Sequence, residues 1–268
     1  MPCKNRKPAK NREKTDYPQS RFAILPHAGL AFSQRGIAPF FLHFPPQTER
    51  ILILAPSHYI ALNSDELILG SFTGYETPLG NLDAFSLSSG QQGGEKAIEN
   101  EHAVEMVLPY LAWIAKQGQN LSVCTALVSH LTSSDRAREI ALTLIDELGE
   151  AELLSGKTLV IASSDFTHYG RRFGHTPFAG DSMPTIEDKV KKDDSVLSSL
   201  LASGNVKQAM DFCKKHQSTV FGIAASSIVA SLAAELKATG RLVDYYTSNE
   251  VYASDQDEFV AYATILWS

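Results

Sequence analysis

The sequence predicts a single-domain α/β protein whose mainly parallel sheet is flanked by helices. Its 268 residues, 44% of them hydrophobic, are enough to build one sizeable core. Short apolar runs rich in β-forming residues alternate along the chain with segments of helical periodicity. Such alternation is typical of parallel strands joined by right-handed helical crossovers. No internal repeat or long linker interrupts the pattern, which indicates one domain.

Four apolar runs have the composition of strands that are buried on both faces, because their apolar residues do not alternate with polar ones. These predicted strands are residues 21–26, 50–56, 121–128 and 157–162. Two later runs, at residues 242–247 and 258–267, are predicted to extend the sheet.

The remaining segments of helical periodicity lie between and after these strands. They predict helices at residues 34–44, 94–117, 133–148, 189–201, 206–215 and 219–238. Pro109 should bend or break the second helix, because proline lacks a backbone donor and its ring clashes with the preceding turn. Residues 77–80 (TPLG) predict a turn, and residues 171–188, rich in glycine, proline and small polar residues, predict a long functional loop.

The first 20 residues differ from the rest of the chain in charge. They carry a net charge of +4, so the remaining residues carry −10 of the total of −6. We interpret residues 1–20 as a disordered basic tail and residues 21–268 as the folded domain. Contact of the tail with RNA, a membrane or a partner is the alternative. An acidic folded domain argues against a nucleic-acid groove, which needs basic side chains to neutralise phosphates.

The sequence also bears on the compartment. No apolar run approaches the roughly 20 residues that span a bilayer, and the N-terminus lacks the apolar segment of a secretory signal. We therefore expect a cytoplasmic protein with no membrane partner. Cys3, Cys124 and Cys213 show no CxxC spacing, so we expect three reduced thiols and no zinc knot.

Histidines follow three of the predicted central strands. His27 comes directly after the first strand, and the other two strands lead into Ser57 and His58, and into Ser163, Ser164, Asp165 and His168. Because the carboxyl ends of parallel strands meet at one edge of a sheet, these side chains should lie close together. Imidazole is both a common metal ligand and an acid/base group, so the cluster predicts metal binding or proton transfer.

Each of these residues also has a structural interpretation. A histidine after a strand often only bonds a nearby carbonyl. Asp165 could ligate a metal, orient His168, or simply cap a turn. His102 and Glu105 share one face of the predicted helix and could present a metal pair or an ordinary solvated surface. The chain contains no Walker, GxSxG or strand-linked GxGxxG motif, which excludes the corresponding nucleotide, serine-hydrolase and dinucleotide classes.

Together these motifs resemble the Memo family over residues 21–267. They are LPHAGLAFS around His27, LAPSHY around His58, YETPLGNLD, ENEHAVEM and SSDFTHYGRRFG. Prokaryotic members of the family are named AmmeMemoRadiSam system protein B. The resemblance implies that His27, His58 and His168 are pocket histidines, with Asp165 beside them.

The resemblance also carries expectations about fold and chemistry. The family fold is similar to that of LigB-type class III extradiol dioxygenases, and its members are associated with iron or copper, redox activity and phosphotyrosine peptides. The name of the prokaryotic members suggests AMMECR-type and radical-SAM proteins as partners. The family commonly has a cysteine near the pocket, in a TICGR-like motif. Here the matching residues 219–222 place Phe221 at that position, so iron(II) or zinc held by imidazole and carboxylate groups is expected over a soft-metal thiolate site.

Two functions remain open at this point. As a redox or dioxygenase-like enzyme, the protein would hold iron (Fe2+), copper or zinc through the metal ligands His27, His58 and His168 or Asp165, with Asp165 and His168 as catalytic residues. The expected ligand-binding residues for a small molecule are Ser57, Ser164, His102 and Glu105. As a binding module without catalysis, the same cleft would capture an anionic peptide or small molecule, aided by Arg171 or Arg172.

Overall fold

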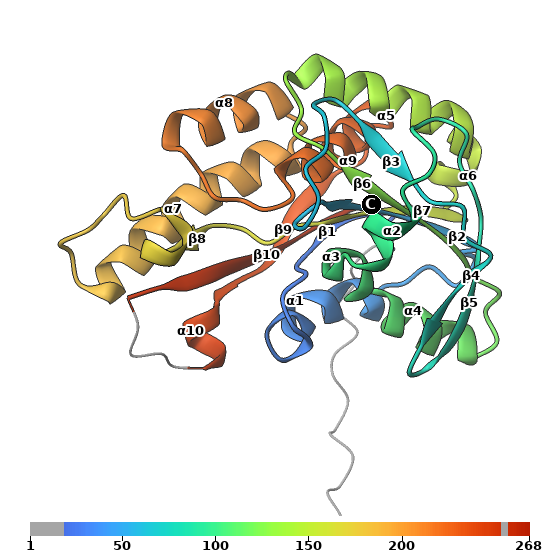
Figure 1. Cartoon of the computed structure of the whole chain (residues 1–268), viewed down its shortest axis with the longest axis horizontal. Helices are drawn as coiled ribbons and strands as arrows, with labels where there is room; N and C mark the ends of the chain where they lie inside the picture. Colours follow the sequence, from blue (N-terminus) through green and yellow to red (C-terminus); the bar gives the residue numbers. More distant parts are fainter. Residues whose placement is uncertain (1–18, 253–256) are drawn as a thin grey trace, which may run out of the picture.

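The protein is described from a computed structural model that covers residues 19–252 and 257–268. The predicted tail, residues 1–20, therefore lies outside the described residues except for its last two. Figure 1 shows one twisted sheet between two layers of helices. The predicted α/β fold with a single domain is confirmed. In the part of the chain that the structure describes, no helix has the length and apolar character to cross a membrane.

The sheet has ten strands in the order β4-β5-β6-β2-β7-β1-β10-β8, with β3 paired to β6 and β9 paired to β10. Strands β5, β6, β2, β7 and β1 are parallel neighbours at its centre, and antiparallel pairs complete its two sides. The strand bounds are β1 Phe22–Leu25, β2 Arg50–Pro56, β3 Leu67–Leu69, β4 Gly74–Thr77, β5 Gly80–Ala84, β6 Ser122–Val128, β7 Thr158–Ser163, β8 His168–Tyr169, β9 Gly240–Thr247 and β10 Phe259–Trp267.

The helices cover both faces of this sheet. Helix α9 packs on β1, β2 and β7, and α5, α7 and α8 form the rest of its layer, whereas α1, α3 and α4 cover the opposite face (Figure 1). The helix bounds are α1 Leu30–Leu42, α2 Glu95–Glu99, α3 His102–Glu105, α4 Leu108–Lys116, α5 Ser134–Leu148, α6 Glu150–Leu154, α7 Met183–Ala202, α8 Val206–His216, α9 Ile223–Glu235 and α10 Ser248–Val251, with a 3-10 turn at Arg171–Phe173.

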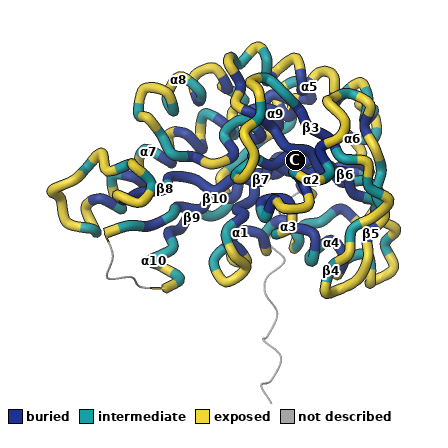
Figure 2. Tube along the Cα trace, viewed as in Figure 1, coloured by how far each residue is buried: buried dark blue, intermediate teal, exposed yellow. Residues whose placement is uncertain are grey.

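The central strands bury side chains on both faces. In β1, Phe22 and Ile24 belong to the core cluster under α9, whereas Ala23 and Leu25 belong to the cluster under α1 and α4. Figure 2 shows these strands as the most buried part of the molecule. Burial on two faces explains why the sequence of these strands is apolar without alternation. Each Leu-to-Ala truncation in such a core costs roughly 2–5 kcal/mol of stability.

The structure differs from the predicted elements at two places. The predicted helix 94–117 is divided into α2, α3 and α4. The predicted break near Pro109 is confirmed, since α4 begins at Leu108 and Pro109 lies in its first turn, where its missing N–H costs nothing. The break between α2 and α3, before His102, was not predicted. The predicted loop 171–188 is shorter, because α7 already begins at Met183. The predicted turn at residues 77–80 is confirmed as the connection of the β4–β5 hairpin.

Candidate metal centre

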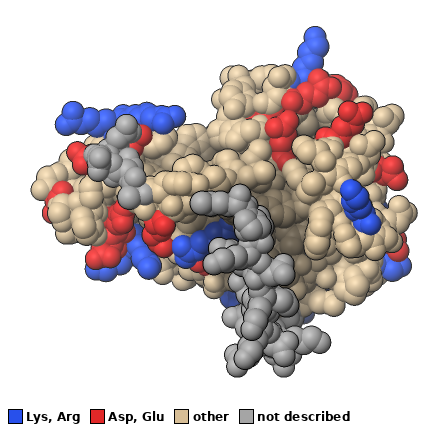
Figure 3. Space-filling model, turned by 90° about the horizontal axis from the view of Figure 1, so that it is seen from below, with Lys and Arg blue, Asp and Glu red and all other residues tan. Residues whose placement is uncertain are grey.

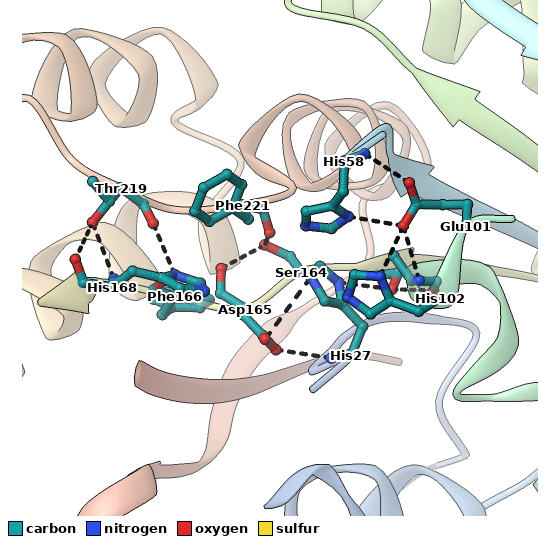
Figure 4. A network of polar contacts seen from close by, with 12 residues as sticks. His27, His58, Glu101, His102, Ser164, Asp165, Phe166, His168, Thr219 and Phe221 are labelled. Atoms are coloured by element: carbon teal, nitrogen blue, oxygen red, sulfur yellow. Dashed lines mark hydrogen bonds and ion pairs between the residues drawn. The ribbon is translucent and has the colours of Figure 1, made fainter. Parts of the chain in front are cut away.

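Three histidine side chains converge at the carboxyl ends of the central strands. His27 follows β1, His58 follows β2, and His102 is the first residue of α3. Each ring offers one nitrogen atom, and these three nitrogen atoms lie within 4.8 Å of one another. The ring centroids are 5.0 Å apart for His27 and His58 and 4.6 Å apart for His58 and His102 (Figure 4). This spacing is compatible with one shared metal ion, and we call the three residues the histidine group.

Hydrogen bonds determine which nitrogen of His27 is free. Its Nδ1 lies 3.0 Å from the Ser163 hydroxyl, and that hydroxyl donates its hydrogen to the Ala103 carbonyl at 2.6 Å. Ser163 can therefore only accept from the imidazole, so we assign the proton to Nδ1. The lone pair on Nε2 of His27 is then free to ligate a metal.

A buried glutamate orients the other two rings. Glu101 is 1% exposed and caps α3, where its carboxylate accepts from the backbone N–H of Ala103 at 3.1 Å. The same carboxylate accepts from the backbone N–H of His58 at 2.7 Å and from His58 Nδ1 at 2.8 Å. His102 Nδ1 lies 3.3 Å from it. Because a carboxylate only accepts, the His58 ring carries its proton on Nδ1 and leaves Nε2 free, as in carboxylate–histidine–metal arrangements. We assign the same tautomer to His102, whose Nδ1 faces the Glu101 carboxylate and also lies 3.0 Å from the Tyr59 hydroxyl.

The charges of the group follow from burial and these hydrogen bonds. Burial, with a smaller contribution from His58 and His102, lowers the pKa of His27 to about 3, so this ring is neutral near pH 7. Burial alone would raise the pKa of Glu101, but hydrogen bonds from His102, His58 and two backbone N–H groups lower it. The hydrogen bond to Glu101 raises the pKa of His102, against its partial burial. The group thus contains one fixed carboxylate and at least one imidazole that stays neutral.

Asp165 adds a second carboxyl group beside His27. Its Oδ1 accepts from the backbone N–H of His27 at 2.8 Å, and its Oδ2 lies 3.8 Å from His27 Nε2. Burial raises the pKa of Asp165, although the backbone N–H groups of His27 and Ala28 and the nearby imidazoles oppose that shift. Asp165 is therefore placed to exchange a proton next to the free nitrogen of His27.

His168 lies outside the histidine group, which changes the ligand set that we expected. The metal-capable group among the described residues contains His102 in its place. His168 Nδ1 lies 2.9 Å from the Phe166 carbonyl and 3.1 Å from the Thr219 carbonyl, which turn the ring toward the α8–α9 loop. The Phe221 ring contacts both His58 and His168, with centroid distances of 5.4 and 4.6 Å, and stands between them in Figure 4.

The predicted ligand-binding residues are divided among different places. The Ser57 hydroxyl donates to the Ile60 carbonyl, and the Ser164 hydroxyl donates to the Phe221 carbonyl at 3.0 Å, so both hold loops next to the histidine group. Glu105 is exposed on α3 and faces a separate cavity near β4. His102 joins the metal-capable group itself.

Sequence reasoning missed Glu101 and Tyr59. Tyr59 is exposed, and its hydroxyl lies 3.0 Å from His102 Nδ1. The available signal for Glu101 was its position directly before His102 and at the start of a helix, where a carboxylate caps the orphan N–H groups.

Figure 3, which views the molecule from below, shows Lys and Arg scattered among Asp and Glu with no broad basic patch on that face.

Comparison with known proteins gives matches along nearly the whole chain. A family model described as Memo-like protein matches residues 3–266. Protein MEMO1 of Xenopus tropicalis is 27% identical over 258 residues, covering 91% of this chain and 84% of that protein. Protein MEMO1 of Homo sapiens is 26% identical with the same coverage of both chains. Protein memo-1 homolog of Caenorhabditis elegans is 26% identical over 260 residues, which cover 91% of this chain and 71% of its own length.

Proposed function

Because the chain belongs to the Memo family, as its motifs predicted, we propose that it is a metal-dependent redox enzyme acting on a small organic molecule. The histidine group would hold one divalent transition metal ion through the Nε2 atoms of His27, His58 and His102. The observation that carries this proposal is that all three Nδ1 atoms have hydrogen-bond partners while the three rings converge. Three protein ligands leave coordination positions open, which is typical of catalytic rather than structural metal sites.

The donor set favours iron(II) or zinc over copper(I). Imidazole suits iron, zinc and copper alike, but copper(I) is selected by soft sulfur ligands. Among the described residues, no cysteine belongs to the metal-capable group. The buried Asp165 carboxyl next to His27 resembles the histidine–carboxylate surroundings of non-haem iron(II), so iron(II) is our first choice. When bound, iron(II) would supply electrons for the reduction of O2.

The residues around the group have separate roles in this proposal. Asp165 takes up or releases a proton beside His27, because its raised pKa lets it exist in both forms nearer to neutral pH. His168 is kept neutral because burial lowers its pKa, and it can serve as a proton acceptor on the other side of Phe221. Ser57 and Ser164 fix the loops that carry His58 and Asp165.

A second candidate function is capture of an anionic group without catalysis. One observation favours it: the hydrogen bond to Glu101 raises the pKa of His102, so this ring can carry positive charge toward a ligand. The sequence suggested Arg171 and Arg172 as additional anion ligands. Both are exposed, and Nη1 of Arg172 lies 3.8 Å from Oε1 of Glu258.

Metal analysis separates the two candidates. Protein without an affinity tag is purified anaerobically, its metal content is measured, and its affinity for iron(II) and zinc is determined by chelator competition. We expect about one ion per chain, and loss of that ion in His27→Ala and His58→Ala. His130→Ala is the matched control, because His130 also follows a central strand but is exposed and outside the histidine group. Equal affinities in wild type and both ligand variants would refute the metal-dependent function.

A further inference from the structure

A cavity of about 800 Å³ lies beside the histidine group, at the carboxyl ends of β2 and β6. Its walls come from the loops after these two strands, from α8 and from the first turns of α9. The volume is in the range of small-molecule sites. Ser57 lines the cavity while the next residue, His58, belongs to the histidine group, so the two sites share a wall.

Phe221 forms another part of that shared wall. It lines the cavity, the residue is 41% exposed, and its ring contacts the rings of His58 and His168. A molecule in the cavity would therefore meet this ring before it reached the histidine group. Apolar side chains make up much of the remaining surface, among them Leu62, Leu131, Met210, Val220 and Ile223. Such a surface suits a ligand with an apolar body.

The start of α9 supplies hydrogen-bond donors to this cavity. Ile223 and Ala224 in its first turn line the cavity, and no side chain caps this 13-residue helix. The N–H groups of a first turn have no partner within the helix and attract negative charge. One turn further, Ser227 lines the same cavity, is 0% exposed, and has no hydrogen-bond partner for its hydroxyl among the described residues. A buried hydroxyl without a partner is costly unless a ligand supplies one.

Among the charged residues that line the cavity, one cation and one carboxylate have no ion pair in the part of the chain that the structure describes. Lys207 is paired with Asp211 at 2.7 Å, and Asp135 lies in the first turn of α5, where it complements that helix's own dipole. Lys214 has no ion pair within the described ranges 19–252 and 257–268. One free ammonium, the uncapped start of α9 and the Ser227 hydroxyl all favour an acceptor with a single negative charge.

We propose that this cavity binds an organic carboxylate with an apolar body, and that it is the substrate compartment of the metal centre. The carboxylate is received by the start of α9, Ser227 and Lys214, and the apolar body lies along Phe221 toward His58. The second part of the proposal rests on the proposed metal-dependent function. A mostly apolar wall with one free cation favours a carboxylate over a phosphate dianion, which would need more positive charge.

The test uses the full-length protein and three probes of equal ring size, namely 2-naphthoate, its neutral amide and 2-naphthyl phosphate. Calorimetry should show that naphthoate binds at least about tenfold more tightly than the amide, because a charged acceptor strengthens each hydrogen bond. Tighter binding of the phosphate would overturn the carboxylate assignment. Equal binding of all three, or of none, would overturn the anion site.

Variants locate the carboxylate. Lys214→Gln should weaken naphthoate binding about tenfold, whereas Lys215→Gln, the exposed neighbour on α8 that does not line the cavity, should leave it unchanged. Ser227→Ala should weaken binding a few-fold yet raise the melting temperature, because it removes a buried hydroxyl without a partner. A rise in melting temperature with unchanged affinity would remove Ser227 from the site.

The link to the metal centre has its own readout. Metal-free protein should still bind naphthoate, because the histidine group does not line the cavity. With Mn(II) added, the relaxation of the bound naphthoate protons should increase, and His27→Ala should abolish the increase. Naphthoate binding without any metal binding would refute the proposed function but keep the carboxylate site. Metal binding without naphthoate binding would refute the carboxylate site alone. If both metal and naphthoate bind but the relaxation of the naphthoate protons does not increase, the link between the cavity and the metal centre is refuted.

Discussion

The histidine group and the neighbouring Asp165–His168 segment both lie at the carboxyl ends of central strands, yet only the first assembles a metal-capable set. In the histidine group, side chains of Ser163 and Glu101 hold the Nδ1 atoms and the rings converge. In the other segment, backbone carbonyls hold the ring of His168 beyond Phe221. Position after a strand thus brings a histidine to the correct edge, and its hydrogen-bond partner decides where the ring points.

The two regions also differ in the state of their carboxyl groups. Hydrogen bonds from two imidazoles and from backbone N–H groups overcome burial and lower the pKa of Glu101, whereas burial dominates and raises the pKa of Asp165. Carboxyl groups whose environments shift their pKa values in opposite directions commonly have different roles. Here Glu101 is a permanent anion that orients ligands, and Asp165 is the group suited to proton exchange.

Replacing one histidine from each region tests the comparison with the largest effect. His102→Ala removes a proposed ligand and should weaken zinc binding by more than roughly 100-fold, because the loss of a ligand costs more affinity than the loss of a hydrogen bond that supports a ligand. His168→Ala should change the affinity by less than about threefold, because its ring lies outside the group. Chelator competition measures both variants. The opposite ranking would restore His168 as the third ligand.

Glu101 should be the next most sensitive position. Glu101→Gln keeps the shape of the side chain but removes the charge that fixes His58 and His102, so zinc affinity should fall about 10–100-fold. Glu105→Gln, on the same short helix, is the matched control, because Glu105 is exposed and faces away into another cavity. If both variants keep wild-type affinity, Glu101 serves only as a cap of α3.

The pH dependence of zinc binding should report on His102. A protonated imidazole cannot ligate a metal, so affinity falls as pH drops through the pKa of the most basic ligand. The hydrogen bond to Glu101 raises the pKa of His102 above its ordinary value of 6.5, whereas the pKa of His27 is lowered to about 3. Affinity should therefore begin to fall near neutral pH, by about tenfold per pH unit. In Glu101→Gln the onset of this fall should move to lower pH, and an unmoved onset would assign the titration to another group.

The sequence predicted the sheet better than the ligand set, for a physical reason. Strands buried on both faces show themselves as apolar runs, and the strand ends at His27 and His58 followed directly from them. The third ligand depends on the break of helix 94–117 before His102, which buries Glu101 and turns it toward His58. Helical periodicity instead paired His102 with Glu105. Tertiary packing determines that break, so local spacing could not reveal it.

Phe221→Cys should have the smallest effect and refines the comparison at the boundary of the two regions. The ring of Phe221 contacts both His58 and His168, so a thiol at this position would face the histidine group. An added thiolate favours a soft ion, and copper(I) affinity should rise roughly tenfold, while zinc affinity should change less. Phe221→Ser is the matched control, because it opens the same space without sulfur. Equal copper(I) affinities of the cysteine and serine variants would mean that residue 221 contributes only apolar surface, and that the boundary between the regions is steric alone.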